Sequence, residues 1–185
     1  MKLKTLAWTA AATAATAAAG GAATDPNSSW YRQLRKPDWQ PPALAFPVVW
    51  TALYADLAVS SAAALDSSNG EDSGNRKTSG TGAGSQKPGG TARKQEIRAY
   101  RGALATNFVL NAAWSWLFWR SRRPWLAAAE AAVLAASSAD LVRRTYRLNQ
   151  RAGVSLAPYA AWCGFATILS TAIARLNPGT GIRQK

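Results

Sequence analysis

An aromatic and proline-rich segment carries the side chains best suited to binding a ligand. Between Trp30 and Tyr54 the chain holds three Trp, two Tyr and four Pro. Because proline fixes φ and has no N–H donor, the part from Asp38 to Pro42 is predicted to be a stiff loop and not a helix. Aromatic side chains stack on flat conjugated rings, so a flat, apolar ligand is what this segment favours.

A helix is predicted to follow these prolines and to present more aromatic side chains. Phe46, Trp50, Tyr54 and Leu57 recur at helical spacing, so they share one face. Pro47 falls within the first turns, where a helix tolerates proline. We therefore expect the loop to cover this face, as a lid over a pocket.

The composition excludes several kinds of chemistry. The chain has 185 residues, is 48% hydrophobic, carries a formal net charge of +13 and contains no His and one Cys. Without His there is no His-ligated metal, no His-ligated haem iron and no His general base. The lone Cys163 excludes an intramolecular disulfide. The basic residues flank apolar runs, as bilayer anchoring requires, so no nucleic-acid partner is expected.

Apolar runs long enough to cross a bilayer, which takes about 20 residues, dominate the rest of the chain. An all-α, multi-pass integral membrane protein is therefore expected, in one domain over residues 1–185. The first run fits a secretory signal peptide as well as a retained helix, because Lys2 and Lys4 precede it and small residues end it. The expected helices cover about 3–23, 43–65, 99–119, 125–146 and 156–176.

The segment between the second and third runs has a different character. Residues 66–92 are rich in Ser, Gly, Thr and Lys and contain no aromatic residue. Such a segment cannot bury enough apolar surface to fold alone, so it is expected to be a disordered hydrophilic insertion. Its glycines do not form a phosphate-binding loop, because no strand precedes them and no Gly-Lys-Ser/Thr closes them.

Several polar side chains interrupt the apolar runs. An acid inside a membrane costs roughly 2.5–3.5 kcal/mol on insertion scales, so Asp56 is expected to face the bundle interior or water, and Glu130 to pack within the bundle or join a polar network. Both suit a polar contact between helices first and a ligand contact second. Asn107, Asn111 and Trp114 share a helical face, and the two amides need partners there. For Asn107 the pattern favours a contact between helices at least as much as a place in the pocket.

The segment from Trp30 to Tyr54 resembles the signature of the TspO/MBR family, the tryptophan-rich sensory proteins related to the mitochondrial translocator protein. The matching pattern is W-Y-x-x-L-x-K-P-x-W-x-P-P, then an aromatic residue or Leu, then W-x-x-L-Y. The third run adds L-N-x-x-W, and the fifth adds P-Y-x-x-W-x-x-F-A-x-x-L followed by L-N-P. The resemblance implies a retained first helix, and hence a bundle of five transmembrane helices with an aromatic pocket beneath the first loop.

The same resemblance implies a membrane receptor or sensor that binds tetrapyrroles such as protoporphyrin IX, with a role in porphyrin handling or stress regulation. Two alternatives stay open: light- and oxygen-dependent degradation of protoporphyrin IX, and transport of porphyrin. No cofactor is required beyond this ligand, and the expected partners are other hydrophobic small molecules, membrane lipid and a second copy of the chain. The expected ligand-binding residues are Tyr31, Trp39, Trp50, Tyr54, Asn111, Trp114, Trp162, Phe165, Ala166 and Leu169.

The last run departs from the family pattern at three positions. Ser170 stands where relatives usually have Asn. Thr171 and Ala172 stand where animal members have aromatic residues that complete a cholesterol motif. Cholesterol transport is therefore the family function least expected of this chain. The distribution of basic residues does not assign which end of the bundle faces which side of the membrane.

Overall fold

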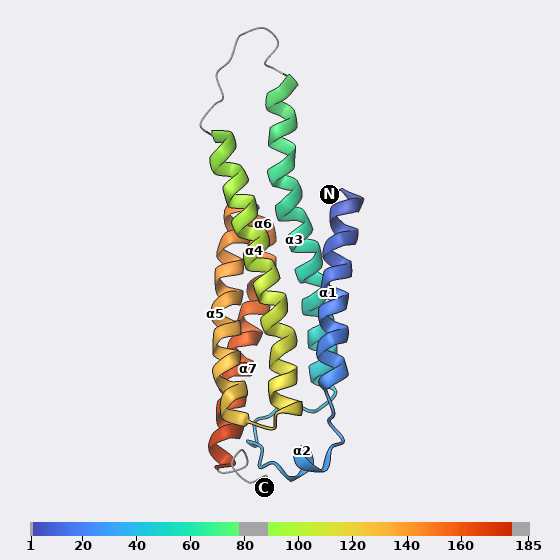
Figure 1. Ribbon diagram of the computed structural model, residues 1–185, viewed down its shortest axis with the longest axis vertical. Coiled ribbons are helices and arrows are strands. Elements are labelled where there is room, and N and C mark those ends of the chain that lie inside the picture. The colour runs from blue at the N-terminus through green and yellow to red at the C-terminus, as the bar shows by residue number, and fades with distance from the viewer. Residues whose placement is uncertain (1, 78–88, 179–185) are drawn as a thin grey trace.

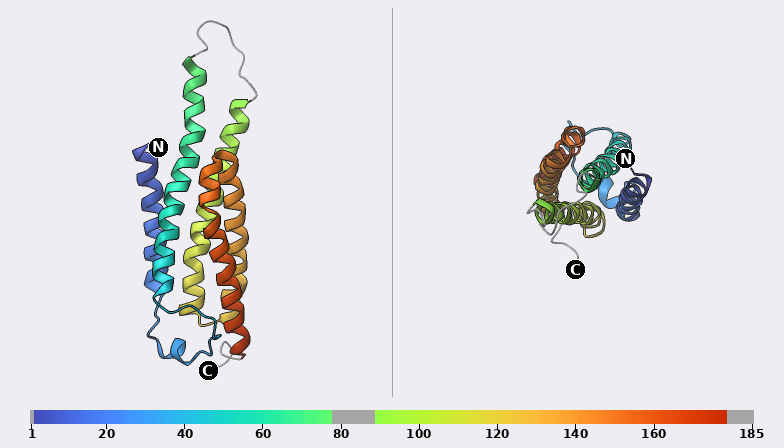
Figure 2. Two further views of the ribbon diagram at one scale, coloured as in Figure 1. Left: turned by 180° about the vertical axis from the view of Figure 1, so that it is seen from behind. Right: turned by 90° about the horizontal axis from the view of Figure 1, so that it is seen from above.

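In the computed structural model, which describes residues 2–77 and 89–178, the chain is an elongated bundle of helices (Figure 1). The described residues contain no strand, so the all-α prediction is confirmed. The longer helices run side by side, and the first loop closes one end of the bundle (Figure 2). In chain order the elements are α1 (Leu3–Ala23), α2 (Ser29–Gln33), α3 (Ala45–Lys77), α4 (Gly89–Ser115), a π-helical turn η1 (Trp116–Arg120), α5 (Pro124–Leu148), α6 (Gln150–Ser155) and α7 (Ala157–Leu176).

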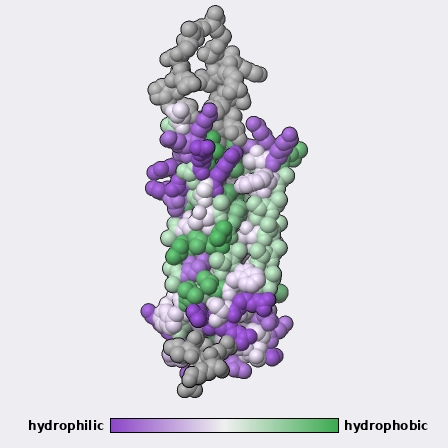
Figure 3. Space-filling view, in the orientation of Figure 1, coloured by the Kyte–Doolittle hydropathy of each residue, from purple (hydrophilic) through white to green (hydrophobic). Residues whose placement is uncertain are grey.

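Three stretches of the described helices are long and apolar enough to cross a membrane, and they cover Ala45–Ser67, Pro124–Leu148 and Gln150–Leu176. On the face shown in Figure 3, the surface between the two hydrophilic ends of the bundle is largely apolar. Large apolar side chains such as Val109 and Ile168 point outward from the bundle. This pattern is that of a protein whose solvent is lipid, and the expected multi-pass membrane protein is confirmed.

The helix α1 packs against α3 and α4 through small and polar residues. Thr9 is fully buried, and its hydroxyl donates to the carbonyl oxygen of Ala58 on α3 at 2.9 Å. The hydroxyl of Thr13 donates to the carbonyl oxygen of Thr9, one turn earlier, at 2.8 Å. Because these hydroxyls are satisfied by backbone oxygens, α1 buries polar side chains at little cost.

The helices that border the hydrophilic segment are longer than the sequence analysis expects. The insertion predicted as disordered over 66–92 is helical at both ends, because α3 continues to Lys77 and α4 already begins at Gly89. Extending an existing helix costs much less than nucleating one, which favours continuation beyond the apolar run. Arg93 joins the two ends by donating from Nη2 to the carbonyl oxygen of Ser67 at 3.2 Å. Residues 78–88 lie outside the described part.

The third predicted helix is divided, and the fifth is preceded by a short additional helix. The third ends as an α-helix at Ser115 and continues as the π-helical turn η1, whose Trp116 donates from Nε1 to the carbonyl oxygen of Ala19 at 3.0 Å. The short helix α6 precedes the fifth, and Asn149 caps it by accepting from the Ala152 N–H at 3.0 Å. Pro158 near the start of α7 has no N–H, which accounts for the break between α6 and α7.

The core consists of two clusters stacked along the bundle. The first contains buried Leu57, Leu104, Leu141 and Tyr159 and fills the middle and the end that holds α6. The second lies at the loop end and contains buried Leu34, Phe118, Ala127, Leu169 and Ile173. Because Leu34 belongs to the first loop, this second cluster attaches the loop to the helices. The partly buried aromatic residues packed on it are Trp30, Tyr31, Phe46, Trp114, Trp119 and Phe165.

Candidate functional site

The first loop is an ordered lid built from α2 and the prolines that follow it. Ser28 caps α2 by accepting from the Tyr31 N–H at 3.4 Å. The Nζ atom of Lys36 lies over the Tyr31 ring, 4.0 Å from its centre. The Tyr31 hydroxyl accepts a hydrogen bond from Gln40 Nε2 at 3.3 Å. The part from Asp38 to Pro42 is not helical, as the prolines predict. These contacts fold the lid back on itself.

The residue directly after α7 attaches this lid to the bundle through hydrogen bonds. Asn177 is buried, and its Oδ1 accepts from the Arg35 N–H at 2.9 Å. Its Nδ2 donates to the carbonyl oxygens of Arg35 and Ile173, both at 2.8 Å. The amide therefore pairs with both backbone groups of one lid residue. This role was not predicted from the sequence, although the L-N-P motif that ends the fifth run was a signal.

Beneath the lid, aromatic rings surround Phe118 of η1. Trp114 of α4 stacks on Phe118 with centroids 5.5 Å apart, and Trp30 of the lid meets its edge at 5.6 Å. Tyr31 lies 4.6 Å from Trp119. The π-helical turn thus presents two successive rings to the lid. Four of the predicted site residues meet in this second cluster: Tyr31, Trp114, Phe165 and Leu169.

A second aromatic group lies on the facing sides of α3 and α7. Trp50 and Tyr54 of α3 have centroids 5.2 Å apart, and Trp162 and Phe165 of α7 have centroids 5.0 Å apart. Phe46 bridges the two helices by meeting the edge of Trp162 at 6.1 Å. The shared face predicted for α3 is confirmed in its packing. Ala166 is half-buried on α7 beside Phe165.

Trp39 lies at the rim of this arrangement. It is 50% exposed and meets the edge of Phe165 at 6.0 Å. Its other side borders a surface hollow of about 490 Å³ on the outer face of α7, which Ile168 and Arg175 also line. Trp39 therefore joins the interior aromatic residues to the lipid-facing surface.

The amides of α4 form one continuous hydrogen-bonded chain across the bundle. The Tyr54 hydroxyl donates to Asn111 Oδ1, and Asn111 Nδ2 donates to the Tyr159 hydroxyl at 2.8 Å. That hydroxyl donates to Asn107 Oδ1 at 2.6 Å, and Asn107 Nδ2 donates to Ser138 Oγ at 3.0 Å. The predicted need for partners is met, and the chain links α3, α4, α5 and α7.

Replacing Asn107 with alanine is expected to destabilise the bundle by about 1–3 kcal/mol, because it removes an acceptor and a donor from fully buried partners. Thermal unfolding in detergent, followed by circular dichroism, measures this change. Thr106→Ala is the matched control, since Thr106 is the neighbouring residue and faces outward. Equal melting temperatures for the two variants would show that the chain of hydrogen bonds does not hold the helices together.

Several buried polar side-chain atoms of the described part have no hydrogen-bond partner, and some of them belong to the aromatic groups. The indole N–H groups of Trp30, Trp114 and Trp162 are among them, as are both carboxyl oxygens of Glu130. The Asn107–Ser138 contact sets the antiparallel register of α4 and α5. Trp114 lies seven residues from Asn107 along α4, and Glu130 lies eight residues from Ser138 along α5, both toward the lid. These separations are about 10 and 12 Å, so Trp114 and Glu130 lie at a similar level of the bundle. Buried unpaired polar groups of this kind are costly, which makes them candidate contacts for a ligand.

The chain matches the model of the TspO/MBR family over residues 7–176. The chain belongs to the TspO/MBR family. It is 29% identical to the tryptophan-rich protein TspO of Chlorobaculum tepidum over 161 residues, which cover 86% of this chain and 87% of the relative. It is 30% identical to the tryptophan-rich sensory protein of Cereibacter sphaeroides, with 80% of this chain and 77% of the relative covered. The human translocator protein is 27% identical, with 81% and 76% covered.

Membership of the TspO/MBR family confirms the identification made from the lid signature. The match begins at Ala7, within α1, and ends at Leu176, so most of α1 is part of the family region. Within the described residues no group of three or more His, Cys, Asp and Glu side chains could hold a metal ion. The ligand-binding role of the predicted site residues stays a prediction.

Proposed function

We propose that this TspO/MBR protein is a membrane sensor or receptor that binds a tetrapyrrole such as protoporphyrin IX among the aromatic residues beneath the lid. The observation that carries the proposal is the set of three buried indole N–H groups without a partner, on Trp30, Trp114 and Trp162. Each is a buried hydrogen-bond donor among aromatic side chains. A ligand that offers acceptors at the edge of a flat ring would satisfy them.

A tetrapyrrole combines the two properties that these side chains favour. Its conjugated ring stacks on Trp and Tyr faces, and each such pair contributes roughly 0.5–1.5 kcal/mol beyond area burial. Its carboxylates accept hydrogen bonds, and charge-assisted bonds are the stronger ones. Arg32, Arg35 and Lys36 place three positive charges on the lid for such carboxylates. The names of several relatives, among them a tryptophan-rich sensory protein, support a sensor role.

The proposal includes a bundle in which five helices cross the bilayer. α1 and α4 are 21 and 27 residues long, and about 20 residues span the hydrocarbon layer. α1 packs beside α3, which contains a clear span, and its buried threonine hydroxyls are satisfied by backbone oxygens. α4 adds the buried amides, whose partners lie on neighbouring helices. Both helices can therefore enter lipid without unpaired polar groups on these residues.

Titration of the detergent-purified protein with protoporphyrin IX tests the binding. We expect saturable binding, read from the porphyrin Soret band and from quenching of Trp fluorescence. Trp50→Ala and Trp162→Ala should each weaken it at least tenfold, because a buried aromatic anchor is typically worth 2 kcal/mol or more at a binding site. Trp125→Ala is the matched control, since Trp125 is 56% exposed at the start of α5.

Binding that is absent, or that is equally strong in all three variants, would contradict the proposal. The aromatic residues would then serve only to pack the bundle. Repeating the titration under light separates binding from the degradation that the family resemblance also implies. A new absorbing product that forms in wild type and not in Trp162→Ala would identify an enzyme, and an unchanged spectrum would identify a binding protein.

A further inference from the structure

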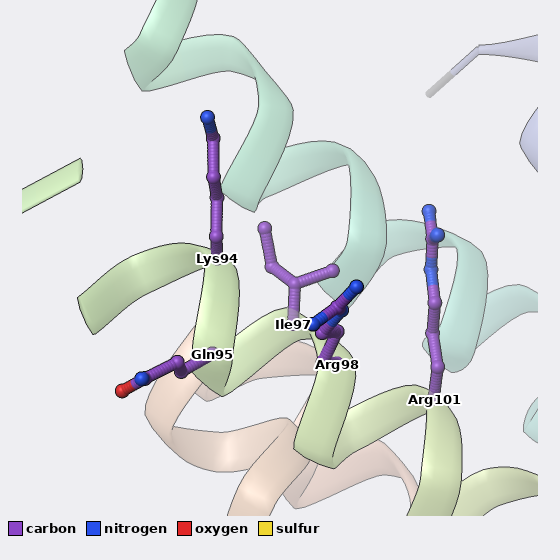
Figure 4. A pocket seen from close by; sticks show the side chains of 5 residues that line it. All are labelled: Lys94, Gln95, Ile97, Arg98 and Arg101. Atoms are coloured by element: carbon purple, nitrogen blue, oxygen red, sulfur yellow. The ribbon is translucent and has the colours of Figure 1, made fainter. Parts of the chain in front are cut away.

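We propose that a basic groove beside the start of α4 binds the headgroup of an anionic phospholipid. The groove encloses about 410 Å³ and lies next to the α3 ribbon (Figure 4). Its three cations recur at i, i+4 and i+7, so they share one face of α4, here called the basic face. The residues that line the groove are Lys94, Gln95, Ile97, Arg98 and Arg101.

The cations of the basic face have no anionic partner within the described residues, unlike the arginines of α5 at the same end of the bundle. Arg143 and Arg144 both pair with Asp140, at 2.9 and 2.5 Å. Glu96 is the one acid among residues 91–101, and its position places it on the opposite side of α4. Like charges four residues apart destabilise a helix, so this face favours an anion from outside the chain.

Contacts between helices place the basic face where an apolar span ends. Ser67 is the last residue of the span in α3, and its carbonyl oxygen accepts from Arg93, which directly precedes Lys94. The Ser67 hydroxyl also accepts from Asn149 Nδ2 at 2.8 Å, directly after the span in α5. The two spans therefore end at one level, which is the level of lipid headgroups. Long Lys and Arg side chains reach such headgroups while their apolar stems cover the helix.

The same face of α4 continues as an apolar surface. Ile97 lies among the cations, and Ala105, Val109 and Ala112 follow at helical spacing toward the middle of the bundle. Val109 is 68% exposed. When the phosphate group of a lipid lies at the cations, its acyl chains therefore lie beside this apolar surface. A soluble anion has no apolar part that could contact this surface, so the arrangement favours a lipid.

The chemistry of the cations suits a phosphodiester. The guanidinium forks of Arg98 and Arg101 match the geometry of phosphate oxygens, and Lys94 adds a compact charge. A headgroup with no positive charge of its own should bind best. The inference rests on the bundle lying in a membrane and not on the tetrapyrrole, because the lid lies at the opposite end (Figure 1).

Native mass spectrometry of the full, delipidated chain in detergent tests the proposal. Phosphatidylglycerol and phosphatidylcholine with identical acyl chains are titrated separately. We expect bound phosphatidylglycerol at concentrations at least tenfold below those that phosphatidylcholine requires. Each basic residue contributes roughly fivefold to anionic-lipid binding, so the triple variant K94Q/R98Q/R101Q should weaken it on the order of a hundredfold. Arg98→Gln alone, which leaves the rest of the face intact, should weaken it about fivefold.

A second triple variant, K4Q/R147Q/R151Q, removes the same charge from exposed positions outside the groove, on α1, α5 and α6. It should keep the preference for phosphatidylglycerol. Equal losses in the two triple variants would show diffuse attraction by the whole basic end and would overturn the proposal. So would equal binding of the two lipids by wild type. Displacement of the lipid by excess inorganic phosphate would also overturn it, since the groove would then be a site for a soluble anion.

Discussion

Replacing Gly153 with alanine is expected to prevent α6 from packing closely against α5. Gly153 is buried, and a Cβ atom built there would overlap the N and Cα atoms of Tyr146. Backbone atoms cannot turn aside as the end of a flexible side chain can, so the two helices must separate. Overpacking typically costs 1–3 kcal/mol, and a clash with backbone places the expected cost at or above about 3 kcal/mol. Thermal unfolding in detergent and the yield of monodisperse protein measure the effect.

Gly164→Ala is the matched control for this substitution. Gly164 lies within α7, and no atom approaches within 4 Å of a Cβ atom built there. Alanine inside a helix is favoured over glycine by up to about 1 kcal/mol, so this variant should melt at or above the wild-type temperature. If both variants instead melted close to wild type, the close approach of α5 and α6 would be wrong.

The positions of the long helices follow from the sequence because each depends on local information. An apolar run of about 20 residues needs internal hydrogen bonding in lipid, and the helix provides it wherever the run occurs. The lid was also predictable, because the restriction that proline places on φ is local. The sequence carries weaker signals for where a helix ends. The continuation of α3 to Lys77 and the change of the third predicted helix to a π-helical turn at Trp116 were therefore not predicted.

The candidate site could be predicted only in part, for a related reason. Helical spacing identified which side chains share a face, such as Asn107 with Asn111 and Trp114. The partners of those side chains depend on how far one helix is shifted along the next, which no local pattern determines. The contacts from Asn107 to Ser138 and from Asn111 to Tyr159 therefore came only from the structure. The same holds for the edge position of Trp39.

Under the proposed function, the lid must be ordered to shield the aromatic residues and must move for a ligand to reach them. Its apolar attachment is Leu34, which is buried in the second cluster. Its polar attachment is Asn177, whose side chain makes hydrogen bonds to both backbone groups of Arg35. Leu34 and Arg35 are consecutive, so both attachments act at one point of the lid.

Replacing Asn177 with alanine is expected to release the lid from α7 without unfolding the helices. The change removes three hydrogen bonds, two to Arg35 and one to the carbonyl oxygen of Ile173. At about 1 kcal/mol for each of the two bonds to Arg35, the lid loses about 2 kcal/mol of attachment, or roughly thirtyfold in its closed-to-open ratio. Hydrogen exchange of the peptide that contains the Arg35 amide should accelerate by a similar factor.

Asn27→Ala is the matched control, because Asn27 lies in the same loop, is exposed, and donates its hydrogen bond to Asp25 Oδ1 from the backbone N–H. In Asn27→Ala the Arg35 amide should exchange hydrogen at the same rate as in wild type. Helix α5 should exchange equally slowly in all three proteins, since Asn177 bonds only to the lid and α7 among the hydrogen bonds described above. Faster exchange throughout α5 in Asn177→Ala would mean that Asn177 stabilises the whole bundle. Unchanged exchange at Arg35 would show that Leu34 and its aromatic neighbours alone hold the lid, and ligand entry would then depend on separating those rings.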